Sequence, residues 1–207
     1  RPGWHTECVV MSLDLLGEGF DLHGGGMDLA FPHHENERAQ AVALGREFAR
    51  HWVHNGFVEV GGEKMSKSLG NSRNVPDLLA EHDPRAYRLL VLQSHYRSPL
   101  EVTDDTIAAA EAALDRLDAL ARRVAEVPDA APDESRLDEF RRHMDDDLDT
   151  AAAMALVFGL VTEVNRLLDE GDDKAAAPLV AAWREMLDAV GLEVGVDDEV
   201  PEEIAAL

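Results

Sequence analysis

Three side chains of metal-binding type lie in the N-terminal part of the sequence. They are the thiol of Cys8, the imidazole of His33 and the carboxylate of Glu37. His33 and Glu37 are four residues apart, so on a helix their side chains share one face. A thiolate, an imidazole and a carboxylate together suit Zn²⁺. Spacing alone leaves other interpretations open, because such a His–Glu pair is common on helix surfaces and a single cysteine is commonly a small buried apolar residue.

A second chemical signal is the use of lysine in GGEKMSKSLGNS, residues 61–72. The chain has three lysines against sixteen arginines, and two of the three, Lys64 and Lys67, lie in this stretch beside glycines. A chain that otherwise uses arginine therefore keeps a compact ammonium group here, on a flexible stem. The alternative interpretation is an ordinary exposed hairpin.

Two helices and a strand are expected to position the three metal-type side chains. Residues 4–16 have apolar residues at helical spacing and stop at Gly17, a typical helix C-cap. Residues 20–26, FDLHGGG, are typical of a short buried strand that runs into a glycine loop. A helix is expected over about 33–46, with Pro32 near its first turn. This order puts the thiol on the first helix and the imidazole and carboxylate on the second.

The remainder reads as an extended segment followed by helices. Residues 51–60, HWVHNGFVEV, are rich in β-branched and aromatic residues and precede a glycine turn at Gly61-Gly62. Thr103 is a typical N-cap for a long helix. Its apolar stripe consists of Ile107, Ala110, Leu114, Leu117, Leu120 and Val124. The expected helices cover about 75–82, 84–94, 103–127, 134–145, 148–170 and 173–190. These patterns predict an α/β region to about residue 95 and a helical bundle after it.

Charge is unevenly distributed along the chain, whose formal net charge is -23. Residues 1–100 hold 13 acidic and 10 basic residues, whereas residues 101–207 hold 29 acidic and 9 basic residues, a net of -20. Eight of the nine histidines lie before residue 100, so chemistry is expected in the first half. An acidic, lysine-poor surface favours a halophile protein, because molar salt screens self-repulsion. The alternative is an ordinary acidic protein.

Other features of the composition concern location. A single cysteine excludes an internal disulfide and favours a reducing, cytoplasmic compartment. The sequence has no signal-like segment and no apolar run of about 20 residues, so no membrane partner is predicted. The sequence starts with RPGWHTEC rather than methionine, which is typical of a chain entered in mid-sequence.

Six motifs, in their order, resemble one family. They are RPGWHTEC, FDLHGGGMDLAFPHHENE, HWVHNGFV, KMSKSLGN, HYRSPL and HMDDDLDT. Together they closely resemble the cysteinyl-tRNA synthetases, which are class I aminoacyl-tRNA synthetases, over essentially the whole chain. KMSKS alone would indicate only class I, whereas FPHHENE downstream of GWHTEC narrows the resemblance to the cysteine enzymes and their close relatives.

The resemblance implies an α/β fold in which the second half of a Rossmann-type catalytic domain is followed by a connecting fold and an α-helical bundle. The implied divisions are residues 1–60 for the catalytic half, 61–98 for the connecting region with KMSKS, 99–192 for the bundle and 193–207 for a truncated tail or linker. The implied activity is activation of L-cysteine with ATP, and with Mg²⁺, to cysteinyl-adenylate, followed by transfer to tRNA(Cys). A monomer is expected.

The resemblance also implies roles for residues of the substrate site. Cys8, His33 and Glu37 match the family's zinc ligands, and one zinc ion per chain would bind the thiolate of the substrate. A polar site of that kind rejects serine without an editing step. Asp28 matches a residue that holds the substrate's amino group. Trp4 and His23 match positions that line the amino acid pocket, although Trp4 could also be a core residue and His23 a strand-end histidine.

Two neighbours of the implied ligands, His34 and Glu35, are expected to be structural and to point away from the ligand face. In the KMSKS loop, Lys67 matches the lysine that stabilises charge developing on the triphosphate. Lys64 is the implied catalytic partner, and the two serines of the motif, Ser66 and Ser68, belong to the implied ATP site.

Two features of the family are not found in this sequence. The family's fourth zinc ligand, an upstream cysteine, and its HIGH motif are absent, and an anticodon-binding domain would follow Leu207. We therefore expect the central portion of a longer enzyme, inactive by itself. The nearest alternative is the cysteine ligase of mycothiol synthesis, which departs at the ENE positions. Two others are a non-catalytic zinc-binding interaction module and a plain acidic helical scaffold.

Overall fold

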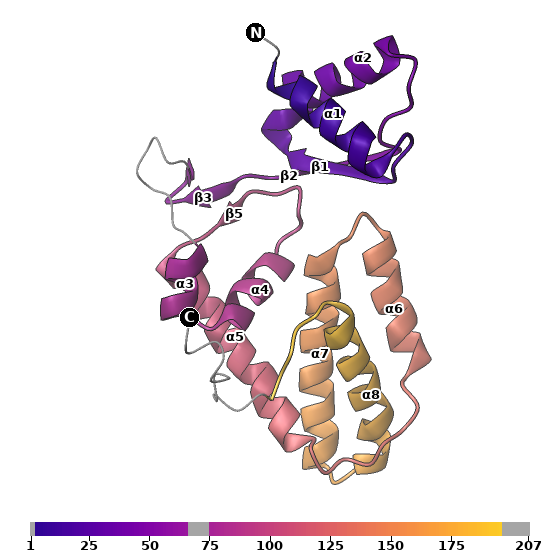
Figure 1. Ribbon diagram of the computed structural model, residues 1–207. Helices are drawn as coiled ribbons and strands as arrows, with labels where there is room; N and C mark the ends of the chain where they lie inside the picture. Colours follow the sequence, from indigo (N-terminus) through magenta and orange to yellow (C-terminus); the bar gives the residue numbers. More distant parts are fainter. Residues whose placement is uncertain (1–2, 66–74, 196–207) are drawn as a thin grey trace. The chain divides into compact units, whose positions relative to one another are not determined.

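The computed structural model describes residues 3–65 and 75–195 (Figure 1). Contacts divide the chain into two compact units. The first consists of Arg1–Gly70 with Tyr96–Glu101, and the second of Asn71–His95 with Val102–Leu207. The mixed α/β and helical architecture that the sequence predicts is confirmed. The finer division at residues 60, 98 and 192 stays a prediction.

A parallel pair of strands and two helices form the centre of the first unit. Strand β1 (Leu22–Gly26) pairs with β2 (His51–Asn55), so that His23 lies opposite Trp52. Helices α1 (Trp4–Leu16) and α2 (Glu35–Ala43) lie on the same side of these strands (Figure 1). Their common core consists of Val9, Phe20, Ala41 and Phe48, with Leu13, Ala49 and Trp52 packed against it.

The glycine predicted to end the first helix does so. Gly17 follows Leu16 with a φ of 81°, in the left-handed region that glycine adopts at little cost. The expected buried strand over 20–26 is wrong in two respects. Strand β1 begins at Leu22, whose side chain is 59% exposed, and none of its residues is buried.

The second helix is shorter than expected at both ends. Before it lie a 3₁₀ turn, η1 (Met27–Leu29), and a π-helical turn, η2 (Ala30–His34). Within η2, Phe31 precedes a proline and has extended backbone angles, φ -139° and ψ 132°, because proline disfavours the α region for the residue before it. At the other end Gly45 has a φ of 68°, and Arg46 N–H donates to Ala41 O at 3.0 Å. With Gly45 N–H, which donates to Val42 O at 2.9 Å, this bond forms a Schellman cap that ends the helix before residue 46.

A second small sheet has the order β4-β3-β5. Strand β3 (Val58–Val60) is antiparallel to β4 (Glu63–Lys64) and parallel to β5 (Leu100–Glu101). The extended region and the turn at Gly61-Gly62 are therefore confirmed, with both glycines at positive φ. Strands β4 and β5 were not expected. They are two residues long, and a sequence period cannot be read from so short a segment.

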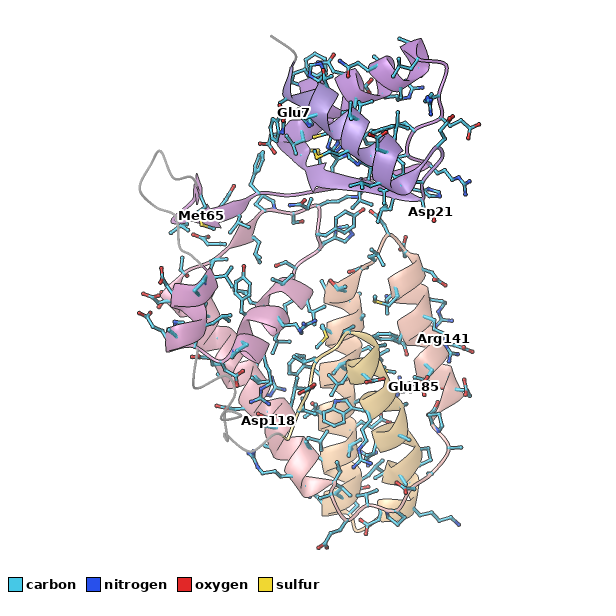
Figure 2. The ribbon with its side chains drawn as sticks, viewed as in Figure 1. Glu7, Asp21, Met65, Asp118, Arg141 and Glu185 are labelled. Carbon is cyan, nitrogen blue, oxygen red and sulfur yellow. The ribbon has the colours of Figure 1, made fainter. Side chains whose placement is uncertain are left out.

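The second unit is helical. Its helices are α3 (Val75–Glu81), α4 (Pro84–Leu92), α5 (Asp104–Arg123), α6 (Glu134–Asp145), α7 (Thr150–Asp169) and α8 (Asp173–Ala189). Thr103 caps α5 in a capping box with Thr106, as its position predicts. All six residues of the predicted apolar stripe are buried. Between α6 and α8, Arg141 Nη2 lies 3.9 Å from Glu185 Oε1 (Figure 2).

Among the described residues, α7 alone has the length and mean hydropathy of a membrane span. The core helix of a helical bundle has the same properties, and α7 packs its buried residues, such as Val157 and Val164, within the second unit.

Candidate functional site

A buried carboxylate lies at the centre of the candidate site. Glu37, in the first turn of α2, is 0% exposed. Its Oε2 atom lies 2.8 Å from His23 Nε2, and its Oε1 atom lies 3.0 Å from His33 Nε2. Neither contact has the in-line N–H geometry of a hydrogen bond, so both oxygens are buried without a hydrogen-bond partner. Buried oxygens without donors are rare in folded proteins, and such a group suits the binding of a cation.

Two groups of three potential ligands share this carboxylate. In the first, one ligand atom each from Cys8, His33 and Glu37 lie within 4.8 Å of one another. In the second, the atoms come from His23, His34 and Glu37, again within 4.8 Å. The convergence expected of the first group is therefore observed, with Cys8 on α1, His33 at the end of η2 and Glu37 on α2. A soft thiolate, an imidazole and a carboxylate fit Zn²⁺ as a donor set.

The environment of Cys8 opposes loss of its proton. Burial raises the pKa of the Cys8 thiol, and the nearby negative charges of Glu37 and Glu7 raise it further. Without a metal, the half-buried thiol therefore keeps its proton at neutral pH. A cation at this position would reverse that preference, because a coordinated thiol is deprotonated.

His34 is a correction to the sequence analysis, which expected it to point away from the ligand face. Its side chain is buried at 4% exposure, lies in the second group, and its Nδ1 atom is 2.8 Å from His54 Nε2. Burial lowers the pKa of His34, as do the neighbouring histidines, against the opposing charge of Glu37. Glu35, by contrast, is exposed and belongs to neither group of ligand atoms, as expected.

Two glycines of the HGGG motif make room for this arrangement. A Cβ atom on Gly25 would lie 2.9 Å from Cε1 of His34, so only glycine lets that ring lie against β1. A Cβ atom on Gly26 would lie 2.6 Å from Oδ1 of Asp28. Asp28 is exposed in η1, directly after the carboxyl end of β1. In parallel sheets, ligands commonly bind at this end of the strands.

Aromatic rings surround the potential ligands. The ring of Trp4 lies 4.3 Å from that of His33, between centroids, although Trp4 itself is 63% exposed. The His23 ring makes edge contacts with Trp52 at 5.0 Å and with Phe48 at 5.6 Å. His23 is therefore held in the aromatic core of the first unit, and Trp4 forms an open side of the site.

His54 was not singled out by sequence reasoning. It reaches the cluster through the β1–β2 register, which pairs it with Gly25. Together with Ala30, His34, Glu35, Arg38 and Trp52 it lines a cavity of about 300 Å³. The signal in the sequence was the alternation of HWVHN, which puts Trp52 and His54 on one side of the strand.

Most of the predicted ATP residues lie outside the described part of the chain. These are Ser66, Lys67 and Ser68. The backbone of Lys64 forms β4 and pairs with Glu59. The hairpin before it is held by Gly62 N–H, which donates to Glu101 Oε1 at 3.2 Å.

The fold is that of class I aminoacyl-tRNA synthetases. A LeuRS–tRNA–LeuAMS complex from Agrobacterium radiobacter K84 aligns with a TM-score of 0.65 and 20% identity, over 83% of this chain and 25% of that one. Methionyl-tRNA synthetase of Mycobacterium tuberculosis in complex with methionyl-adenylate aligns with a TM-score of 0.61 and 21% identity, over 84% and 40% of the two chains.

Family models identify the chain more closely. Residues 1–112 match the catalytic domain of class I (C) tRNA synthetases, and residues 139–194 match the DALR domain. The chain therefore belongs to the class I (C) tRNA synthetase family. Relatives include the cysteine–tRNA ligases of Halorhodospira halophila, 50% identical over 93% of this chain and 42% of the relative, and of Geobacter sulfurreducens, 46% identical over 97% and 44%. The chain thus spans less than half the length of these curated relatives.

Proposed function

We propose that this chain is part of a cysteine–tRNA ligase, a cytoplasmic, monomeric enzyme that activates L-cysteine with ATP and transfers it to tRNA(Cys). The observation that carries the proposal is the buried cluster of Cys8, His33 and Glu37, in which both carboxylate oxygens lack a hydrogen bond. Such a cluster can hold a thiophilic metal ion. It suits an enzyme whose substrate is itself a thiol.

Cys8, His33 and Glu37 would hold one zinc ion, with a fourth protein ligand supplied from outside residues 1–207. Bound there, zinc would supply a soft Lewis acid that prefers the thiolate of cysteine to the hydroxyl of serine. Because the hydroxyl of serine would not replace the zinc–thiolate contact, discrimination between cysteine and serine would need no editing step. The exposed ring of Trp4 and the imidazole of His23 would form walls of the amino acid pocket.

Other residues would bind the remaining parts of the substrates. The exposed carboxylate of Asp28 lies at the carboxyl end of β1 and would pair with the substrate's ammonium group. Lys64 and Lys67, with Ser66 and Ser68, would close over the triphosphate of ATP and its Mg²⁺. A flexible ammonium group suits charge that develops during adenylate formation.

Full activity is expected to need the longer protein that the relatives represent. The outer side of α1 supports this view, since Met11 is 52% exposed and Leu15 is 81% exposed. Large apolar residues clustered on an exposed side of a helix commonly mark a contact surface. We therefore infer that further polypeptide covers α1 in the intact enzyme, and that the chain alone is inactive.

The test is cysteine-dependent ATP–pyrophosphate exchange by the longer protein, with its zinc content measured in parallel. Wild type is expected to use cysteine and to reject serine. Cys8→Ser should lose both zinc and exchange, whereas Glu35→Gln, an exposed neighbour outside the cluster, should lose neither. Zinc-free wild-type protein that catalyses cysteine-dependent ATP–pyrophosphate exchange at the full rate would contradict the proposed role of the cluster.

A further inference from the structure

A hydrogen bond joins the two helices that carry the potential zinc ligands. Gln40 Nε2, on α2, donates to Thr6 Oγ1, on α1, at 3.0 Å, and both side chains are partly buried. Thr6 lies two residues before Cys8, and Gln40 lies three residues after Glu37. We propose that this pair is a positioning device, which fixes the rotation of α1 about its own axis and thereby keeps Cys8 beside His33 and Glu37.

The apolar character of α1 makes such a device necessary. Val9 is buried in the core of the first unit, but Val10, Met11 and Leu15 on the other side of the helix are more than half exposed. Because apolar attraction has no direction, burial alone distinguishes poorly between the two sides of this helix. A polar pair distinguishes them, in the way that a single polar residue sets register in a coiled coil.

The positions around the helix fit this role. With 3.6 residues per turn, Thr6 and Cys8 lie about 160° apart around the axis, at the two flanks of the side that Val9 presents to the core. One flank is held by the hydrogen bond to Gln40, and the other carries the thiol toward Glu37. A bond at one flank therefore limits the movement of the other.

The tolerance of a metal site sets how firmly α1 must be held. Side-chain atoms lie about 5–6 Å from a helix axis, so a rotation of about 20° moves the Cys8 sulfur by about 2 Å. Metal–ligand distances tolerate changes of only about 0.2 Å. A small rotation that apolar packing would permit is thus enough to remove the thiol from the cluster.

The inference rests on the proposed zinc site and is tested on the 207-residue chain with two readouts. The first is the affinity for Zn²⁺ alone, by competition with a chelator. The second needs no metal, and is the alkylation rate of Cys8, the only cysteine in the chain. Thr6→Val removes the hydroxyl at constant shape, and Thr6→Ser keeps it. Thr162→Val makes the same change in α7, where the hydroxyl donates to Phe158 O of its own helix.

Thr6→Val is expected to weaken zinc binding by about tenfold, as loss of a partner outside the ligand shell does. Alkylation of Cys8 should become faster by about threefold or more, because α1 gains local freedom. Thr6→Ser and Thr162→Val should behave as wild type. If Thr6→Val fails to fold, Gln40→Met removes the same bond from the other helix.

Two results would overturn the inference: a Thr6→Val chain that matches wild type in both readouts, or a Thr6→Ser chain that is as impaired as Thr6→Val. If the wild-type chain binds no zinc, the proposed metal site fails instead. The alkylation rates still decide, in that case, whether the Thr6–Gln40 bond positions Cys8.

Discussion

Replacing Glu37 by glutamine should change the stability of the first unit in opposite directions with and without zinc. In the metal-free chain the carboxylate is fully buried and neither oxygen accepts an in-line hydrogen bond. An amide of the same size carries no charge. Its N–H group can also donate to a neighbouring imidazole nitrogen, that of His23 or of His33. We therefore expect Glu37→Gln to be more stable than wild type when zinc is removed.

The expected change in stability follows from the free energy that it costs to bury the two carboxylate oxygens of Glu37 without hydrogen-bond donors. A buried polar group without a partner costs about 1–3 kcal/mol, and the imidazole nitrogens of His23 and His33 recover part of it through proximity. A gain of about 1–2 kcal/mol for Glu37→Gln is thus expected in the presence of a chelator. With zinc at 100 times its dissociation constant, wild type gains about 2.7 kcal/mol by linkage. The variant has lost a ligand and gains less, so the order of stability reverses.

The measurement must report on the first unit alone, since contacts divide the chain into two compact units and Glu37 lies in the first. Hydrogen–deuterium exchange of peptides from α1, β1 and α2, followed by mass spectrometry, gives the free energy of local and global opening in this region. Glu35→Gln is the matched control, because Glu35 is exposed and lies on the same helix. Hydrogen–deuterium exchange of Glu35→Gln should match that of wild type both with chelator and with zinc.

Easier opening of Glu37→Gln than of wild type in chelator would contradict this expectation. That result would mean that Glu37 is stabilised by its two histidines as a structural ion pair. An unchanged order of stability after zinc addition would show that the carboxylate is not a ligand.

Four further predictions concern other parts of the molecule. Burial and the charge of Glu37 raise the pKa of Cys8, so its thiol is protonated at neutral pH and must lose the proton to bind zinc. The affinity of the chain for zinc should therefore increase from pH 6.5 to 8, and a pH-independent dissociation constant would exclude Cys8 as a ligand. In the longer protein, Lys67→Ala should slow cysteinyl-adenylate formation more than it weakens cysteine binding, which pre-steady-state kinetics can separate; an unchanged rate removes Lys67 from the mechanism. With a net charge of -20 over residues 101–207, the melting temperature should rise between 0.1 M and 2 M KCl, and a flat response, corrected with a neutral control protein, would contradict the halophile interpretation. Asp118, labelled in Figure 2, is buried and accepts from Arg85 Nη1 at 3.2 Å and from Gly195 N at 2.7 Å. Asp118→Ala should therefore cost about 2–3 kcal/mol in urea unfolding, whereas the exposed control Asp115→Ala should cost less than about 0.5 kcal/mol.

Local chemistry made much of the secondary structure predictable from the sequence. Gly17 ends α1 and Thr103 begins α5 because their backbone and side-chain preferences act within a few residues. The stripe from Ile107 to Val124 is buried because one face of a helix repeats every 3.6 residues. The three potential zinc ligands were also found from the sequence, where the order of the surrounding motifs resolved an ambiguity that spacing left open.

Tertiary structure decided which other residues join them. His34 lies three residues before Glu37, so its helical backbone (φ -65°, ψ -35°) puts the two side chains on neighbouring positions of one face. Gly25, on a separate strand, leaves space for the His34 ring beside them. His54 arrives through strand pairing with a segment about thirty residues earlier in the chain. Such register and the rotation of α1 depend on contacts between distant residues, which no local pattern encodes. The sequence by itself determined which side chains of metal-binding type are present, whereas the burial of Glu37 and the histidines around it exist only once β1, β2 and the two helices have packed together.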